Sequence, residues 1–379
     1  MRTQVRSDSR GKLAILLVPL ALSVVLSSPA RAEPAAKRAP APGSFTIENF
    51  QLESGVTLPK AIVVYGTYGT LNAAKDNAVL LPSHYMAQSD GYDWLSGEGR
   101  ALDPKKHFLI MTELFGNGRS SSPSNTPPPF HGPRFPVTSI RDNVEAVRRL
   151  LEDGLGIHHL KAVVGFSMGA EQAFQWAVSH PKFADKIVAT AGTARCWPHG
   201  VVRLDSQIRA LTIDPAFKRG DYTEQPATGI ETTGAVWLAW LYSQEWWKRE
   251  LWKKTDPESA TMTLAQYMEK QGKEFFAGAD ANNLILQMRT WQAHDVGTTP
   301  GFGGSTERAL RSIAVPVLYM PSETDLYFPI GDARQESTWI RRVTLAPIPS
   351  LWGHTAGIGA SPEDLAFIER KLRAFLAAP

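Results

Sequence analysis

The sequence predicts an α/β protein with a mostly parallel central sheet, helices on both faces and an inserted helical cap. Three observations lead to this fold class. Apolar runs rich in β-branched residues alternate with segments of helical periodicity before residue 195 and again after residue 305. Between these two parts, residues 196–304 show helical segments and few strand-like runs. Residues 162–178 join a short apolar strand to a helix through a turn of the form G-x-S-x-G.

The first 32 residues have the features of a secretory signal peptide. The apolar stretch Leu13–Leu26 is preceded by four basic residues, Arg2, Arg6, Arg10 and Lys12. Ala30-Arg31-Ala32 supplies an A-x-A cleavage motif. The stretch is short for a transmembrane helix, and an uncleaved N-terminal anchor is the alternative. We therefore expect cleavage after Ala32 and a periplasmic or secreted mature protein with no membrane association.

Signal removal changes the charge of the chain. The full chain carries +3, and residues 1–32 carry +4 (five bases and one acid), so the remainder carries −1. This balance predicts no nucleic-acid partner. Cys196 is the only cysteine in the sequence, which excludes an internal disulfide, and no Cys/His cluster has the spacing of a metal site. We therefore expect no metal and no cofactor.

The domain begins after a Pro/Ala-rich segment, residues 33–43, which we expect to be a disordered linker. Four runs rich in apolar residues predict strands at 45–52, 60–68, 77–81 and 107–112. A loop of Gly, Ser and Pro covers 116–136. A helix is then predicted over 138–151 by the spacing of Ile140, Val144, Val147, Leu150 and Leu151.

The alternation continues on both sides of the helical block. Strands are predicted at 162–164, 186–190, 314–320 and 343–346, and helices at 170–178, 332–341 and 361–377. We expect one domain over 44–379, with a core of 44–195 and 305–379 and a cap of 196–304. The cap contains seven tryptophans, which we interpret as packing of cap on core, with an aromatic substrate pocket as the alternative: Trp197, Trp237, Trp240, Trp246, Trp247, Trp252 and Trp291.

The G-x-S-x-G turn has the layout of a nucleophile elbow, which would place the hydroxyl of Ser167 at the end of the sheet. Gly165 and Gly169 suit this turn, because the strand and the helix pass too close for a side chain. A serine hydroxyl is a poor nucleophile at neutral pH. It needs a base to take its proton and a carboxylate to orient that base.

Both partners are present at suitable places later in the chain. Strand 314–320 runs into a loop in which Asp325 is the best candidate acid; Glu323 is the alternative, and Asp332 falls in the next predicted helix. His354 lies in a Gly-rich loop before the terminal helix. The order Ser, acid, His is that of α/β-hydrolases. We expect the two oxyanion donors to be the backbone N–H groups of Met168 and Tyr85, with Met86 as the alternative to Tyr85.

Several stretches carry a family resemblance. In the core they are Gly99–Asp103, the Phe-Pro-x-x-x-Ile-Arg-Asp run of Phe135–Asp142, and Gly165–Gly169 with Gln172 and Trp176. In the cap they are Asp214-Pro215, Gly220–Tyr222, Asp280–Asn282 and His294–Gly297. With these stretches the chain resembles the homoserine O-acetyltransferase family of α/β-hydrolases over nearly all of 45–379. The resemblance implies Ser167, Asp325 and His354 as the triad, a helical cap that bounds a tunnel to the serine, and a possible homodimer.

The chain departs from that family where the amino-acid substrate is bound. The family's carboxylate-binding Arg falls at Gly234, a Tyr falls at or near Leu241, and the Asp after the catalytic His is Thr355 here. The segment 232–241, which includes Trp237, is largely apolar. An amino acid leaving water needs charged partners, so these positions favour a neutral ester instead. We expect Gly234, Trp237, Leu241 and Thr355 to bind the substrate.

Export also favours water as the second substrate, because acetyl-CoA is a cytoplasmic metabolite. The sequence therefore predicts an exported serine hydrolase that cleaves a small, apolar carboxylic ester through an acyl-enzyme on Ser167. The alternatives are an acyl-CoA-dependent O-acyltransferase of the homoserine type and a binding protein on a hydrolase fold that has lost catalysis.

Overall fold

The computed structural model describes residues 41–378. The predicted signal peptide and residues 33–40 of the predicted linker lie outside the described residues. The linker prediction was too long at its end, because β1 (Ala41–Gln51) already pairs through residues 41–43 with β2 (Thr57–Tyr68). The Pro/Ala composition concealed this strand. β1 is the edge strand of the sheet, and a proline such as Pro42 is tolerated at an edge.

The eight strands of the described residues form one sheet in the order β1-β2-β4-β3-β5-β6-β7-β8. β1, β2 and β4 are antiparallel neighbours, and every pairing from β4 to β8 is parallel. The prediction of a mostly parallel sheet is therefore confirmed. The remaining strands are β3 (Ala78–Pro82), β4 (Phe108–Thr112), β5 (Ala162–Phe166), β6 (Ile187–Thr190), β7 (Val317–Met320) and β8 (Val343–Leu345).

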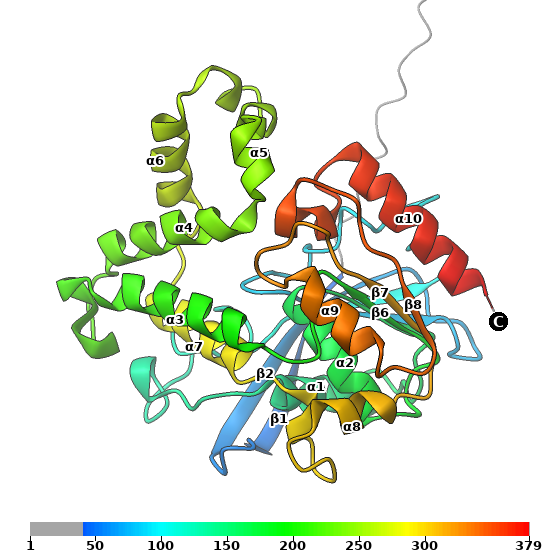
Figure 1. The fold of residues 1–379 in the computed structure, drawn as a ribbon. Helices are drawn as coiled ribbons and strands as arrows, with labels where there is room; N and C mark the ends of the chain where they lie inside the picture. The colour runs from blue at the N-terminus through cyan, green and yellow to red at the C-terminus, as the bar shows by residue number, and fades with distance from the viewer. Residues whose placement is uncertain (1–40, 379) are drawn as a thin grey trace, which may run out of the picture. The chain divides into compact units, whose positions relative to one another are not determined.

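Helices cover both faces of this sheet, because alternate strand residues enter two separate cores. Ala78 and Leu80 of β3 belong to one core, and Val79 and Leu81 belong to the other. Besides the helices of the cap, four described helices pack into the first core: α1 (Ile140–Arg149), α2 (Met168–Ser179), α8 (Thr306–Arg311) and α9 (Ile330–Ser337). Among the α-helices of residues 41–378, α10 (Pro362–Ala377) alone packs into the second core, and Figure 1 shows it apart from α1 and α2.

The helical cap lies between β6 and β7, where the structure has no strand. Its helices are α3 (Pro198–Thr212), α4 (Ala227–Leu241), α5 (Gln244–Lys248), α6 (Leu264–Glu274) and α7 (Ala281–Gln292). Figure 1 shows α4, α5 and α6 (green) projecting away from the sheet, while α7 (yellow) runs beside α3. Among the described residues, no helix combines the length and apolarity that crossing a bilayer requires.

Short helical turns complete the fold. A π-helical turn, η2 (Leu150–Gly154), extends α1. The 3₁₀ turns are η1 (Gly132–Arg134), η3 (Pro215–Gly220), η4 (Leu251–Lys254), η5 (Ser259–Thr261), η6 (Val296–Thr298) and η7 (Gly353–Ile358).

Candidate active site

Ser167 occupies a strained turn between β5 and α2. Its backbone has φ 56° and ψ −126°, which an L-residue adopts only when its surroundings enforce it. The surroundings are tight. A Cβ on Gly165 would lie 2.0 Å from the carbonyl oxygen of Gly169, and a Cβ on Gly169 would lie 2.4 Å from that of Pro82. Glycine at both positions therefore permits the close crossing that presents the Ser167 hydroxyl.

The structure brings Ser167, His354 and Asp325 together from three separate segments. Nε2 of His354 lies 3.0 Å from Oγ of Ser167, and its Nδ1 lies 2.8 Å from Oδ2 of Asp325. All three residues are buried. Asp325 follows β7, and His354 lies in η7 after β8. The carboxylate bonded to His354 is that of Asp325, whereas Glu323 is exposed.

Asp325 is fixed by the backbone as well as by the histidine. Its Oδ1 accepts the N–H groups of Tyr327 at 2.7 Å and Phe328 at 3.1 Å. Its Oδ2 remains for His354. An ionised carboxylate in this position favours the imidazole tautomer that carries its proton on Nδ1. Nε2 of His354 is then free to accept the proton of Ser167.

A cavity of about 370 Å³ opens onto Ser167. Among the described residues, its lining contains no Arg, Lys, Asp or Glu. Burial lowers the pKa of His84 to about 4, with a smaller contribution from His354, so the His84 ring is neutral at pH 7. Around the catalytic base, the lining therefore offers no charged side chain. Its residues are His84, Tyr85, Met86, Phe166, Ser167, Trp237, Leu241, Tyr242, Phe275, Phe276, Trp291, Tyr327, His354, Thr355 and Ile358.

Comparison with known proteins agrees with this geometry. The family model described as the alpha/beta hydrolase fold matches residues 79–354. The chain belongs to the α/β hydrolase family. Among its relatives, an ethyl acetate hydrolase of Pseudomonas veronii is 36% identical over 331 residues, which cover 86% of this chain and 93% of the relative. A homoserine O-acetyltransferase of Chlorobium luteolum is 29% identical over 344 residues, covering 88% of this chain and 93% of that protein.

A solved structure extends this comparison. An acetylester hydrolase from Corynebacterium glutamicum superposes on this α/β hydrolase with a TM-score of 0.85 at 30% identity. The match covers 89% of this chain and 96% of that one. The predicted placement of the chain in the homoserine O-acetyltransferase-like branch of the α/β hydrolases is therefore confirmed.

The oxyanion donors of this hydrolase stay a prediction, but the structure favours one of the two alternatives for the second donor. Met168 is the first residue of α2, and its N–H finds no acceptor among the described residues. The N–H of Met86 already donates to Oε1 of Gln287 at 2.7 Å. The N–H of Tyr85 has no such partner within residues 41–378. Of the two alternatives, Tyr85 is therefore the one whose peptide is free to bind an oxyanion.

Three of the four predicted substrate contacts line the cavity of the hydrolase, namely Trp237, Leu241 and Thr355. Gly234 does not, and that prediction is wrong. A Cβ there would lie 2.7 Å from the carbonyl oxygen of Gly272, because α6 crosses α4 at this turn. The glycine serves the contact between these two helices.

Several lining residues of the hydrolase were not foreseen from its sequence. Tyr327 lies two residues beyond Asp325, and its position beside the predicted acid was an available signal. Phe275 and Phe276 directly follow the last residue of α6. At this helix end, the sequence pattern does not distinguish an aromatic side chain that faces the serine from one that packs elsewhere. Their role follows only from the packing of the cap.

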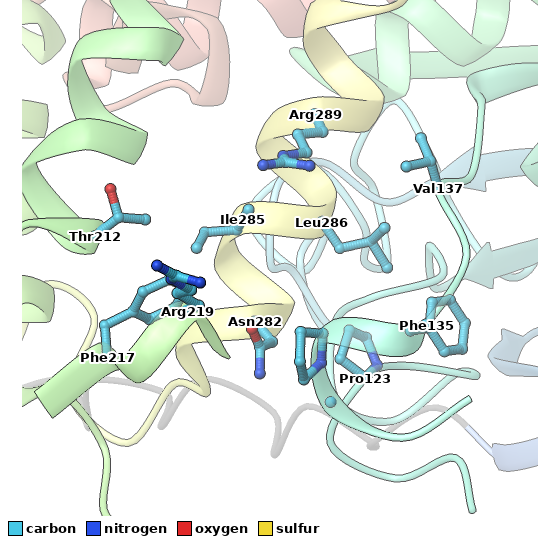
Figure 2. Close-up of a pocket in the computed structure, with 12 residues that line it drawn as sticks. Pro123, Phe135, Val137, Thr212, Phe217, Arg219, Asn282, Ile285, Leu286 and Arg289 are labelled. Carbon is cyan, nitrogen blue, oxygen red and sulfur yellow. The ribbon is translucent and has the colours of Figure 1, made fainter. Parts of the chain in front are cut away.

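A second cavity of the hydrolase, of about 400 Å³, lies away from the triad (Figure 2). Figure 2 shows Arg219 and Arg289 flanking Ile285 of α7, opposite Pro123 and Phe135. None of Ser167, Asp325 and His354 lines it. Within residues 41–378, no group of three or more His, Cys, Asp or Glu side chains is arranged to hold a metal ion.

Proposed function

We propose that this chain is an exported serine ester hydrolase that cleaves small, apolar carboxylic esters through an acyl-enzyme on Ser167. The observation that carries the proposal is the cavity at Ser167, whose lining is aromatic and aliphatic and holds no Arg, Lys, Asp or Glu. Such a wall suits a neutral ester. The ethyl acetate hydrolase and the acetylester hydrolase among the relatives support the same substrate class.

The proposed reaction has two half-reactions. Oγ of Ser167 attacks the ester carbonyl while Nε2 of His354 takes its proton. The backbone N–H groups of Met168 and Tyr85 stabilise the oxyanion, and His354 then returns the proton to the leaving alcohol. In the second half-reaction, water loses a proton to His354 and attacks the acyl-enzyme. The carboxylic acid leaves, and Ser167 regains its hydrogen.

The cavity argues against transfer to homoserine. Homoserine would bring a carboxylate and an ammonium group into a cavity whose lining holds no Arg, Lys, Asp or Glu, and both groups need charged partners where they lose water. Leu241 and Thr355 line the cavity at two of the positions where the transferases are expected to carry polar or charged residues. Neither side chain can neutralise a charge.

Export is part of the proposal and rests on the sequence of residues 1–32. It supports water as the acyl acceptor, because an exported enzyme has no supply of acetyl-CoA. N-terminal sequencing of the protein secreted by an expression host tests it, and a first residue of Glu33 is expected. Pairing of two chains through the cap stays a prediction, which size-exclusion chromatography with light scattering tests.

Esterase assays on the purified mature chain test the reaction. We expect hydrolysis of p-nitrophenyl acetate in buffer alone, with no increase on addition of homoserine and no need for acetyl-CoA. Ser167→Ala should abolish turnover, and a fluorophosphonate probe should label the wild type but not this variant. If product release requires acetyl-CoA or homoserine, the protein is an acyltransferase and the proposed hydrolase function is wrong. Absence of both turnover and labelling would indicate an inactive binding protein.

A further inference from the structure

Beside the aromatic wall of the cavity lies a buried arginine, Arg203, that the proposed reaction does not use, and the neighbouring helix α2 carries a buried carboxyl, that of Glu171. Arg203 of α3 is 1% exposed, and Glu171 of α2 is fully buried. Burial raises the pKa of the Glu171 carboxyl well above its usual range, and the charge of Arg203 opposes this shift. Burying charges costs free energy unless other interactions compensate for the lost hydration.

Hydrogen bonds provide little of that compensation. Nη1 of Arg203 donates to Oε1 of Gln207 at 3.0 Å. Nε and Nη2 of Arg203, and both carboxylate oxygens of Glu171, have no hydrogen-bond partner within residues 41–378. A buried arginine with most of its donors unused calls for another explanation.

Aromatic rings supply that explanation. The guanidinium carbon of Arg203 lies 4.1 Å from the ring centroid of Tyr327, 4.5 Å from that of Trp291 and 5.6 Å from that of Trp237. A planar guanidinium stacks on aromatic faces and is attracted to their π electrons, most strongly where water is excluded. One side chain therefore contacts three rings from three elements, namely the loop after β7, α7 and α4.

These three rings line the cavity at Ser167, whereas Arg203 does not. Arg203 thus contacts the rings from outside the cavity. Tyr327 connects them to the triad, because its N–H donates to Asp325 and its hydroxyl donates to the carbonyl oxygen of Trp237 at 2.7 Å. A shift of Arg203 would move both the wall and the loop that carries the acid.

We propose that Arg203 is a positioning residue that holds the rings of Trp237, Trp291 and Tyr327 in place and so sets which acyl groups fit beside Ser167. The inference deepens the proposed ester hydrolysis and rests on it. With the rings released, the cavity loses its fixed shape, and discrimination between short and long acyl chains falls.

The test compares p-nitrophenyl acetate, butyrate and octanoate. Arg203→Met alone removes the positive charge that favours the ionised form of the buried Glu171 carboxyl and so risks unfolding. The main variant is therefore the double substitution Arg203→Met with Glu171→Met, because replacing both buried ionisable groups by apolar groups of similar size is often neutral for stability. We expect a folded protein in which the ratio of kcat/KM for acetate to that for octanoate shifts by about tenfold or more.

Two further variants separate the causes. Arg203→Lys keeps the charge but not the planar stack, and it should show the same loss of discrimination. Arg195→Met is the matched control, because Arg195 stacks on the Trp197 ring at 5.0 Å, away from the cavity lining. It should leave the ratio unchanged. A folded double variant with the wild-type ratio would overturn the proposal, and so would wild-type discrimination in Arg203→Lys.

A second readout keeps this inference distinct from the proposed function. Absence of ester turnover in the wild type would refute the proposed function alone. The rates at which short-chain and long-chain alkyl phosphonofluoridates label Ser167 would then still report the shape of the wall. If Arg203 positions the rings, the ratio of these two rates shifts in the double variant. An unchanged ratio would overturn the inference whatever the esterase assay shows.

Discussion

Asp325 divides its two carboxylate oxygens between the backbone and His354. Oδ2 lies 2.8 Å from Nδ1 of His354, and Oδ1 accepts two N–H groups, those of Tyr327 and Phe328. In all three of these hydrogen bonds the carboxylate oxygen is the acceptor. The site is therefore built for a group that only accepts, and an amide in its place would oppose one donor with another.

Asp325→Asn should accordingly fold but lose most of its activity. The Asn amide nitrogen must face either the two backbone N–H groups or Nδ1–H of His354. The second arrangement favours the wrong histidine tautomer, so we expect kcat to fall by roughly 10³–10⁴-fold. Steady-state kinetics with p-nitrophenyl acetate measure this loss. Glu323→Gln is the control and should keep full activity, because Glu323 is exposed. The reverse result would make Glu323 the acid.

The close crossing of β5 and α2 predicts that Gly165→Ala is far more damaging than an ordinary glycine substitution. Its Cβ would lie 2.0 Å from the carbonyl oxygen of Gly169, which is backbone and cannot move alone. We expect a loss of about 3 kcal/mol or more in the free energy of unfolding, measured in urea. Gly331→Ala is the control: in α9, its Cβ would meet nothing within 4 Å, and the change should stabilise by up to about 1 kcal/mol. Equal stabilities of the two variants would contradict this account.

The elements foreseen from the sequence are those determined by nearby residues. Gly165, Ser167 and Gly169 form their turn within five positions, so the pattern alone indicates it. The prediction that Gly234 binds the substrate comes from its alignment with the family's carboxylate-binding Arg. Its actual contact, with Gly272, depends on how two cap helices cross, which no local pattern encodes. For a similar reason, the sequence pattern does not reveal the role of Arg203. Its burial depends on rings from three elements that meet only in the folded chain.

The burial of His294 predicts that the folded protein loses stability in acid. Burial lowers the pKa of its imidazole from 6.5 to about 3, and Nε2 has no hydrogen-bond partner among residues 41–378. The unfolded chain therefore binds a proton at a pH where the folded chain does not. Stability is fully present above about pH 6.5 and decreases as the pH falls toward 3. At pH 5 this one group should account for a loss on the order of 2 kcal/mol.

Urea unfolding of wild type and His294→Leu at pH 7 and pH 5 measures this contribution. The variant should lose less stability than the wild type between the two pH values. His131→Leu serves as the control, because His131 is exposed, and its pH dependence should match the wild type. A difference between pH 7 and pH 5 that is identical in His294→Leu and the wild type would show that His294 does not titrate in this way.

Tyr85→Phe separates the backbone of Tyr85 from its side chain. The hydroxyl donates to the carbonyl oxygen of Leu284 at 3.0 Å, whereas the role predicted for Tyr85 in catalysis belongs to its peptide N–H. The variant should therefore lose about 1 kcal/mol of stability and keep kcat within a few-fold of wild type. Tyr92→Phe is the informative comparison, because the Tyr92 hydroxyl accepts the N–H of Phe166 at 2.9 Å and its loss leaves that group unpaired in the core. Tyr92→Phe should cost more stability, about 1–3 kcal/mol. A hundredfold fall in kcat for Tyr85→Phe would instead assign the oxyanion contact to the hydroxyl.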